Sequence, residues 1–137
     1  MECLSDCWSS HQDTLEGTSF NNTLRGGIGT DYLDGRGGAD TYLFSSGDGQ
    51  DTLHDTGNDT SVDTLVLSGA GLTSTNVRAS RVGTSNDIQL SFGGGSTDSI
   101  LLKNQLFGGI AGKYGVESIR FSNGVTWNET QLSSALR

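Results

Sequence analysis

The fold of this 137-residue chain is decided by residues 26–43, which read Gly26-Gly-Ile-Gly-Thr-Asp-Tyr-Leu-Asp34 and Gly35-Arg-Gly-Gly-Ala-Asp-Thr-Tyr-Leu43. Both stretches are copies of one nine-residue unit, with glycines at its start, Asp at its sixth position and a large apolar residue at its eighth. A fixed period indicates a stack of repeated units, because each unit buries its apolar side chain against its neighbours.

Weaker copies flank these two. Residues 17–25 form an earlier copy, in which Asn22 takes the Asp position and Leu24 the apolar position. Residues 46–53 form a later copy, which follows two inserted residues, Phe44 and Ser45. The repeat region therefore extends from Gly17 to Leu53.

Each unit divides into a turn and a short strand. Its glycines permit the positive φ angles that such frequent turns require. In the strand 32–34 or 41–43 we expect the central side chain to point inward and its neighbours outward. Since two units complete one coil, turn 17–22 is predicted to lie on turn 35–40, and turn 26–31 on turn 46–51.

Stacked turns of this composition predict a calcium site. Backbone carbonyls and one carboxylate from each turn make an all-oxygen cage of about six ligands, which suits Ca²⁺. Magnesium demands tighter octahedral geometry, and zinc would lack its usual nitrogen or sulfur ligands. The sequence thus predicts Ca²⁺ as the cofactor, in about two to four copies.

Charge is concentrated in the repeats. The formal net charge is −8, and the stretch from Asp31 to Asp63 holds eight Asp residues and a single Arg. Acidic, Gly-rich segments are commonly unfolded linkers, but Asp at one phase of a repeat favours metal binding. Nucleic acid is not an expected partner, since phosphate binding needs clustered Lys and Arg. No apolar run approaches the roughly 20 residues of a transmembrane segment, and no N-terminal signal peptide is recognisable.

The repeats resemble the repeats-in-toxin (RTX) nonapeptide GGxGxDxUx, the unit of a calcium-binding parallel β-roll. The resemblance implies that the carbonyls of the first four turn positions and the sixth-position Asp bind calcium. Those residues are Gly26, Gly27, Ile28, Gly29 and Asp31 in one copy, and Gly35, Arg36, Gly37, Gly38 and Asp40 in the next. Asn22 departs from the pattern and removes a charge, so we expect a weaker site where it meets Asp40.

Residues 47–69 resemble the end of the roll in secreted bacterial proteases and related proteins. Acidic residues in comparable places complete the last sites there, and these correspond to Asp48, Asp51 and Asp63. Asp55 and Asp59 lie in an irregular stretch, and we expect both to face solvent.

After Gly69 the chain predicts strands at residues 77–82, 88–92, 98–103, 116–121 and 125–127. Asn123-Gly124 predicts a tight turn, and Asn128 with Gln131 predicts a capped helix through Leu136. We interpret this half as a cap on the open end of the roll; a ligand-binding sandwich is the alternative. Gly115–Trp127 resembles the domain that follows RTX repeats in exported bacterial proteins.

The predicted fold class is all-β: a short parallel β-roll, continued and capped by C-terminal antiparallel strands and a short terminal helix. The predicted organisation is an unassigned segment at 1–16, the calcium-binding roll at 17–69 and a C-terminal β capping region at 70–137. Cys3 and Cys7 lie outside the repeats, and we interpret them as incidental thiols.

No catalytic motif accompanies His11 or His54, so the chain is not expected to be an enzyme. The resemblance implies a secreted, extracellular module that folds on binding Ca²⁺ and serves in export through a type I secretion channel. The alternative is a calcium-dependent polysaccharide-binding or adhesion module, with Tyr32, Lys103 and Trp127 as candidate contacts. A fragment of a larger enzyme, toxin or adhesin is a third hypothesis.

Overall fold

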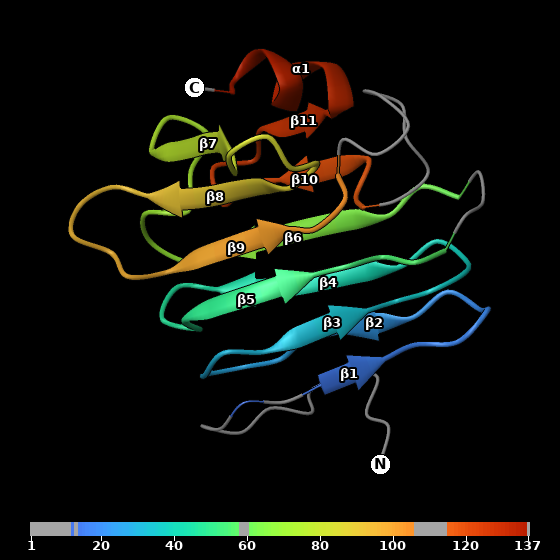
Figure 1. Ribbon diagram of the computed structural model, residues 1–137. Helices are drawn as coiled ribbons and strands as arrows, with labels where there is room; N and C mark the ends of the chain where they lie inside the picture. Colours follow the sequence, from blue (N-terminus) through green and yellow to red (C-terminus); the bar gives the residue numbers. More distant parts are fainter. Residues whose placement is uncertain (1–11, 13, 58–60, 106–114, 137) are drawn as a thin grey trace.

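The computed structural model describes residue 12 and residues 14–57, 61–105 and 115–136. The chain winds into coils whose strands form two facing sheets (Figure 1). The strands are β1 (Thr14–Glu16), β2 (Thr23–Leu24), β3 (Tyr32–Asp34), β4 (Thr41–Ser45), β5 (Gln50–Leu53), β6 (Thr64–Ser68), β7 (Val77–Arg81), β8 (Ile88–Phe92), β9 (Ser99–Leu102), β10 (Ser118–Arg120) and β11 (Thr126–Asn128). One helix, α1 (Glu129–Ser134), follows them in the part of the chain that the structure describes.

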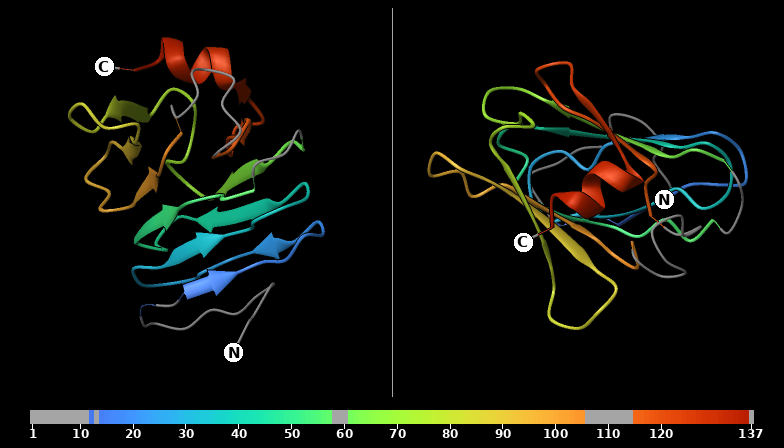
Figure 2. Two further views of the ribbon diagram at one scale, coloured as in Figure 1. Left: turned by 45° about the vertical axis from the view of Figure 1, so that its right-hand side comes forward. Right: turned by 90° about the horizontal axis from the view of Figure 1, so that it is seen from above.

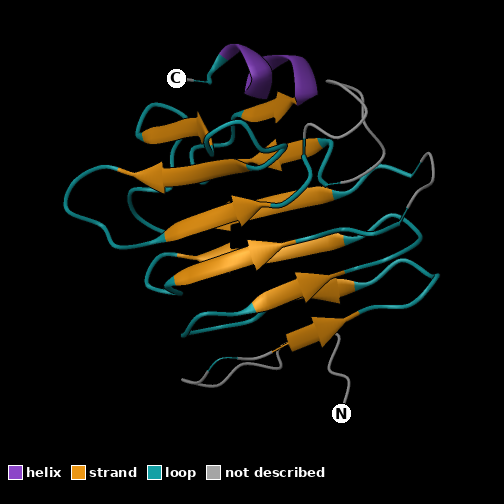
Figure 3. Cartoon of the chain, in the orientation of Figure 1, coloured by secondary structure: helices purple, strands orange, loops and turns teal. Residues whose placement is uncertain are grey.

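The two sheets are built from alternate strands of the coil. One has six strands in the order β1-β3-β5-β9-β8-β7, and the other has five in the order β11-β10-β6-β4-β2. Pairing from β1 to β9 in the first sheet and from β2 to β10 in the second is parallel. The coils rise from β1 to α1, with loops along both edges (Figure 3). The predicted all-β class and its parallel roll are confirmed.

The register of the strands follows the nonapeptide period and its insertions. Asn22 and Asp40 in neighbouring coils are 18 residues apart, whereas Asp31 and Asp51 are 20 apart. The two extra residues are Phe44 and Ser45, which lengthen β4. Because side chains alternate along a strand with a period of two, an insertion of two residues preserves which side chains face inward.

The eighth-position side chains lie in the interior of the roll. Leu24, Leu33, Tyr42 and Leu53 are all buried, which confirms the predicted inward direction. Leu15 is buried in the same way, so β1 adds a strand to the roll within a segment to which we had assigned no element.

The C-terminal strands lie where the sequence predicted them, and they continue the roll. β9 pairs parallel with β5 and antiparallel with β8, while β10 pairs parallel with β6 and antiparallel with β11. Both sheets therefore extend past Gly69, and the division into 1–16, 17–69 and 70–137 stays a prediction.

Helix α1 lies across the end of the stack, as the view from above shows (Figure 2). Its N-terminus has the predicted capping box, in which the Asn128 side chain accepts from the Gln131 backbone N–H. The helix ends at Ser134 rather than at the predicted Leu136, because Leu136 leaves it to form a β-bridge with Ala79. Cys3, Cys7, His11 and Asp59 lie outside the described residues. Within the described part of the chain, no helix has the length and apolar character to cross a membrane.

The turns gather along two edges of the stack, named here by their place in Figure 1. The right-hand edge comprises turns 17–22 and 35–40, together with residues 54–57 and 61–63 of the β5–β6 connection. The left-hand edge comprises turns 25–31 and 46–49, together with residues 50–51 at the start of β5.

Candidate metal centre

Turns on the same edge lie directly on one another, as the sequence predicted. At the right-hand edge the Gly37 backbone N–H donates to the Thr18 carbonyl over 3.1 Å. At the left-hand edge the Gly29 N–H donates to the Asp48 carbonyl over 3.0 Å. The peptide groups of successive turns are therefore within hydrogen-bond reach, as the predicted stacking requires.

A repeated hydrogen bond aligns the carboxylates of the right-hand edge. Asp40 Oδ1 accepts from the Asn22 backbone N–H at 2.7 Å, and Asp63 Oδ1 accepts from the Asp40 N–H at 2.8 Å. Glu117 Oε2 continues the series by accepting from the Asp63 N–H at 2.7 Å. Each sixth-position residue is thus held by an acid from the coil that follows it.

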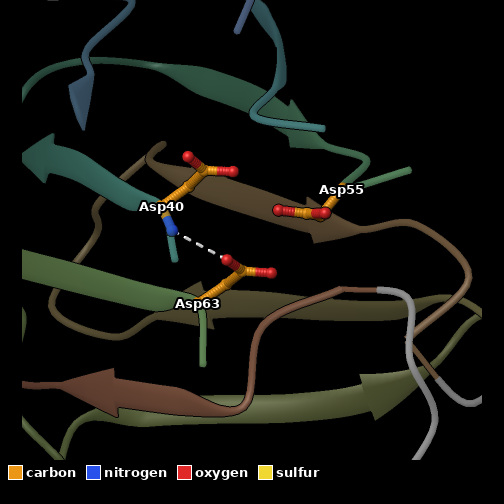
Figure 4. Close-up of side chains that lie close together, drawn as sticks. All are labelled: Asp40, Asp55 and Asp63. Carbon is orange, nitrogen blue, oxygen red and sulfur yellow. Dashed lines mark hydrogen bonds between the residues drawn. The ribbon is translucent and has the colours of Figure 1, made fainter. Parts of the chain in front are cut away.

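Three carboxylates converge on this edge. One oxygen from each of Asp40, Asp55 and Asp63 lies within 4.8 Å of the others (Figure 4). All three residues are buried, with at most 2 % of their surface exposed. The prediction that Asp55 faces solvent is therefore wrong, because Asp55 Oδ2 accepts from the Tyr42 hydroxyl at 2.7 Å. Burial raises the pKa of Asp63, and the neighbouring charge of Asp55 acts in the same direction.

The left-hand edge holds a second group of acids. Asp31, Asp48 and Asp51 are at most 3 % exposed. Asp51 Oδ1 accepts from the Asp31 N–H at 3.1 Å, and Asp51 Oδ2 is buried with no hydrogen-bond partner among the described residues. Burial raises the pKa of Asp51 to about 8, and the charges of Asp31 and Asp48 also raise it. Asp51 therefore resists ionisation unless a positive charge lies close to it.

The remaining predicted ligands are backbone groups of the two turns. A Cβ atom on Gly26 or Gly35 would collide with the carboxylate of Asp31 or Asp40, so both positions require glycine. Arg36 takes a positive φ of 68° in place of a repeat glycine, and its guanidinium pairs with Glu16. Gly27, Ile28, Gly29, Gly37 and Gly38 lie in the same turns, and calcium binding by their carbonyls stays a prediction.

Comparison with protein families agrees with this geometry. Residues 9–42 match the family described as RTX calcium-binding nonapeptide repeat (4 copies). The chain carries RTX repeats. Residues 87–131 match the haemolysin-type calcium binding protein related domain, so the resemblance stated from the sequence is confirmed. A comparison with curated protein sequences gave no match.

RTX repeats bind calcium, and the residues of this chain fit that ion. The candidate metal ligands at both edges are all oxygen atoms, as Ca²⁺ prefers. The buried Oδ2 of Asp51 lacks a hydrogen-bond partner in the described region. RTX repeat proteins are typically exported by type I secretion and act outside the cell, and neither matched family is enzymatic.

Two further acids of this RTX chain were not predicted as site residues. Glu117 closes the right-hand series, and Asp98 accepts from the backbone N–H groups of Gly47 at 2.8 Å and Gly49 at 3.1 Å. Burial raises the pKa of Glu117 to about 7, with Glu129 and Asp55 acting in the same direction. Both acids come from the haemolysin-related region, and their partners Gly47, Gly49 and Asp63 lie between the two matched segments.

Of the candidate carbohydrate contacts, Tyr32 and Trp127 are not brought together, whereas Lys103 directly follows β9 in the sheet that holds Tyr32. Tyr32 lies in the six-stranded sheet and Trp127 in the five-stranded sheet, where Trp127 packs edge-on against Phe121 with ring centroids 4.7 Å apart. The Tyr32 hydroxyl lies 2.6 Å from Nδ1 of His54.

A negative charge at Asn22, which stands where the repeat has Asp, is expected to strengthen the RTX calcium site. Asn22 Oδ1 accepts from the Thr18 backbone N–H at 2.7 Å, and a carboxylate keeps this bond. Asn22→Asp should therefore tighten calcium binding by roughly tenfold, since ligand charge sets affinity. Without calcium at about pH 5, where protonation of the acids is expected to let the roll form, it should lower the melting temperature by like-charge repulsion. Calorimetric titration and melting in EGTA measure the two effects.

The matched control is Asn21→Asp in the same turn, where Asn21 is exposed and its Oδ1 accepts from the Ala39 backbone N–H. It adds the same charge outside the carboxylate series, so affinity should change by less than about twofold. Equal effects from the two variants would contradict a site between Asn22 and Asp40.

Proposed function

We propose that this chain is a calcium-dependent folding module of an exported protein: it is expanded without calcium and closes into the roll when Ca²⁺ binds outside the cell. The observation that carries the proposal is the burial of acids at both edges. Asp31, Asp40, Asp48, Asp51, Asp55 and Asp63 are each at most 3 % exposed.

Closing the metal-free roll is unfavourable at neutral pH. Burying an ionised carboxylate costs solvation, and like charges brought together add repulsion. The turns are also rich in glycine, which loses more conformational entropy on ordering than other residues. A divalent ion reverses the electrostatic part of this balance, and one site stabilises the fold by about 4 kcal/mol when free calcium is 1,000-fold above Kd.

Calcium at the turns would also stabilise the C-terminal half. Glu117 and Asp98 bond to backbone N–H groups next to the candidate ligands. Strands β9 and β10 pair with β5 and β6. The haemolysin-related region therefore docks on the last coil of the roll, and its order depends on that coil being closed.

This behaviour suits export. Extracellular calcium modules have dissociation constants of about 10⁻⁴–10⁻³ M, so the low calcium of the cytosol would leave the roll open. An open chain passes more readily through a type I channel, which is the partner we propose. Carbohydrate binding is the alternative function, and it has less support because Tyr32 and Trp127 lie in different sheets.

The proposal is tested by titrating the chain from EGTA into millimolar calcium at neutral pH, with heat and far-UV circular dichroism recorded together. Calcium should bind and bring a cooperative gain of β structure. Magnesium at the same concentration should give little of either, because it demands tighter octahedral geometry and retains its waters. Calcium binding with an unchanged spectrum would refute metal-driven folding, and absence of binding would refute the calcium site itself.

A further inference from the structure

Arg25 places a positive charge against the left-hand group of acids. It is the last residue of the copy 17–25 and directly precedes the turn that begins at Gly26. Its guanidinium Nη2 lies 3.6 Å from Asp48 Oδ1, and the Asp48 side chain is only 4 % exposed. The Arg25 side chain is itself 27 % exposed, and its Nε atom is buried. The charge is therefore held beside the turns rather than in open solvent.

Asp48 belongs to the same pair of turns as the other left-hand candidate ligands. Its carbonyl accepts from the Gly29 backbone N–H at 3.0 Å, while the Asp31 backbone N–H donates to Asp51 Oδ1 at 3.1 Å. The second oxygen of the Asp48 carboxylate accepts from the Ser45 N–H at 2.9 Å. One carboxylate oxygen of Asp48 thus faces the guanidinium and the other a backbone N–H, so a divalent ion at this edge would bind close to Arg25.

We propose that Arg25 is an internal counter-ion that partly neutralises the left-hand acids when calcium is absent and lowers the calcium affinity of that edge when calcium is present. The inference rests on the proposed function, since it concerns the same metal response. Arg25 cannot lose its charge in the accessible pH range. It therefore repels a divalent ion at this edge under all conditions, while it weakens the repulsion among the acids that would otherwise open the metal-free turns.

The arrangement sets the calcium concentration at which the chain responds. A cation beside the acids makes the left-hand edge less dependent on metal, and it raises the calcium concentration at which the ion occupies that edge. The left-hand edge is then filled only where the ion is abundant, as it is outside a cell.

The test removes the charge of Arg25 and keeps the length of the side chain as nearly as possible. In calorimetric titrations with calcium chloride, Arg25→Gln is expected to bind roughly tenfold more tightly than the wild type, because one repulsive charge is lost. In EGTA at about pH 5, where protonation of the acids is expected to let the metal-free roll form, the same variant should melt at lower temperature. Arg25→Lys retains the charge and should remain within about threefold of wild-type affinity.

The control variant is Arg120→Gln, which makes the same change in net charge on the exposed side of β10. Its calcium affinity should stay within about twofold of the wild type, because exposed, distant charges are screened by salt. A gain seen with Arg25→Gln but not with Arg120→Gln supports a local counter-ion.

The remaining outcomes overturn the inference. Unchanged or weaker calcium binding by Arg25→Gln would mean that Arg25 positions Asp48 instead of competing with the ion. Failure of this variant to fold in millimolar calcium would overturn it too, because calcium should replace the lost charge. If the wild type binds no calcium, the proposed function fails as well, whereas wild-type binding without the Arg25 effect removes only this inference.

Discussion

With calcium removed by EGTA, the protein is expected to be largely unfolded at about pH 9 and to regain its β structure at about pH 5. The reason is that protons can replace the ion as the source of positive charge among the buried acids. Far-UV circular dichroism and thermal melting across this pH range, in EGTA, measure the effect.

The sign follows from the pKa values of the metal-free fold. Asp51 has an ordinary pKa of 3.8 and a pKa of about 8 when buried in the folded chain. Between these values the folded chain holds a proton that the unfolded chain has lost, so raising the pH lowers the free energy of unfolding. One group contributes at most about 1.4 kcal/mol per pH unit. Burial raises the pKa of Asp55 and of Asp63 as well, so several groups act in the same direction.

Calcium should reverse this dependence, because the ion stabilises the ionised acids. In millimolar calcium the melting temperature is expected to stay high at about pH 9. The difference in melting temperature with and without calcium should be smallest at about pH 5, where protons compete with the ion for the carboxylates. Asp51→Asn keeps an oxygen for the Asp31 N–H and removes one titrating group, so its metal-free stability should vary less with pH. A metal-free chain that becomes more stable from about pH 5 to pH 9 would contradict the electrostatic basis of the proposed switch.

The fold could be predicted from the sequence because the nonapeptide couples local and long-range structure. Glycine fixes where the chain turns, and the eighth-position side chains of Leu24, Leu33 and Tyr42 can be buried only against neighbouring coils. With a constant period, the stacking of turns follows from counting residues. The insertion of Phe44 and Ser45 did not disturb the prediction, since it preserves the alternation of side chains along β4.

The residues that were missed lie where the period breaks. Asp55 comes from the lengthened β5–β6 connection, and its burial depends on the reach of the Tyr42 hydroxyl across the coil. No sequence spacing encodes that contact. Asp98 bonds to Gly49, which lies 49 residues earlier in the chain, and Glu117 bonds to Asp63, 54 residues earlier. Contacts between residues so far apart in sequence cannot be derived from a nine-residue repeat.

A weaker signal for these acids is nevertheless present. In the repeats an acid stands two residues before a buried apolar side chain, as in Asp51-Thr-Leu53. The same phase recurs in Asp98-Ser-Ile100 and Glu117-Ser-Ile119, and Ile100 and Ile119 are both buried. Asp13-Thr-Leu15 has it as well, which agrees with a family match that begins at residue 9. A three-residue pattern of an acid followed by an apolar residue two positions later also arises by chance. It becomes informative only with the parallel pairing of β9 with β5 and of β10 with β6.

Loss of one buried hydroxyl is expected to destabilise the folded chain strongly. The Tyr42 hydroxyl accepts from the Gly35 backbone N–H at 2.7 Å and donates to Asp55 Oδ2 at 2.7 Å. Tyr42→Phe retains the ring in the core and leaves both of these buried groups without their partner. Each such loss costs about 1–3 kcal/mol, so the free energy of unfolding in saturating calcium should fall by about 2–4 kcal/mol. Urea unfolding monitored by circular dichroism measures it.

The same substitution at Tyr32 provides the control, since the half-buried Tyr32 hydroxyl contacts His54 on the outside of β3. Water can replace that partner, and Tyr32→Phe should cost less than about 1 kcal/mol. A large loss confined to Tyr42→Phe would mean that the apolar position of the repeat is occupied here by a tyrosine because its hydroxyl connects the turn at Gly35 to Asp55. Equal, small losses from both variants would refute that role and leave Tyr42 as a core side chain alone.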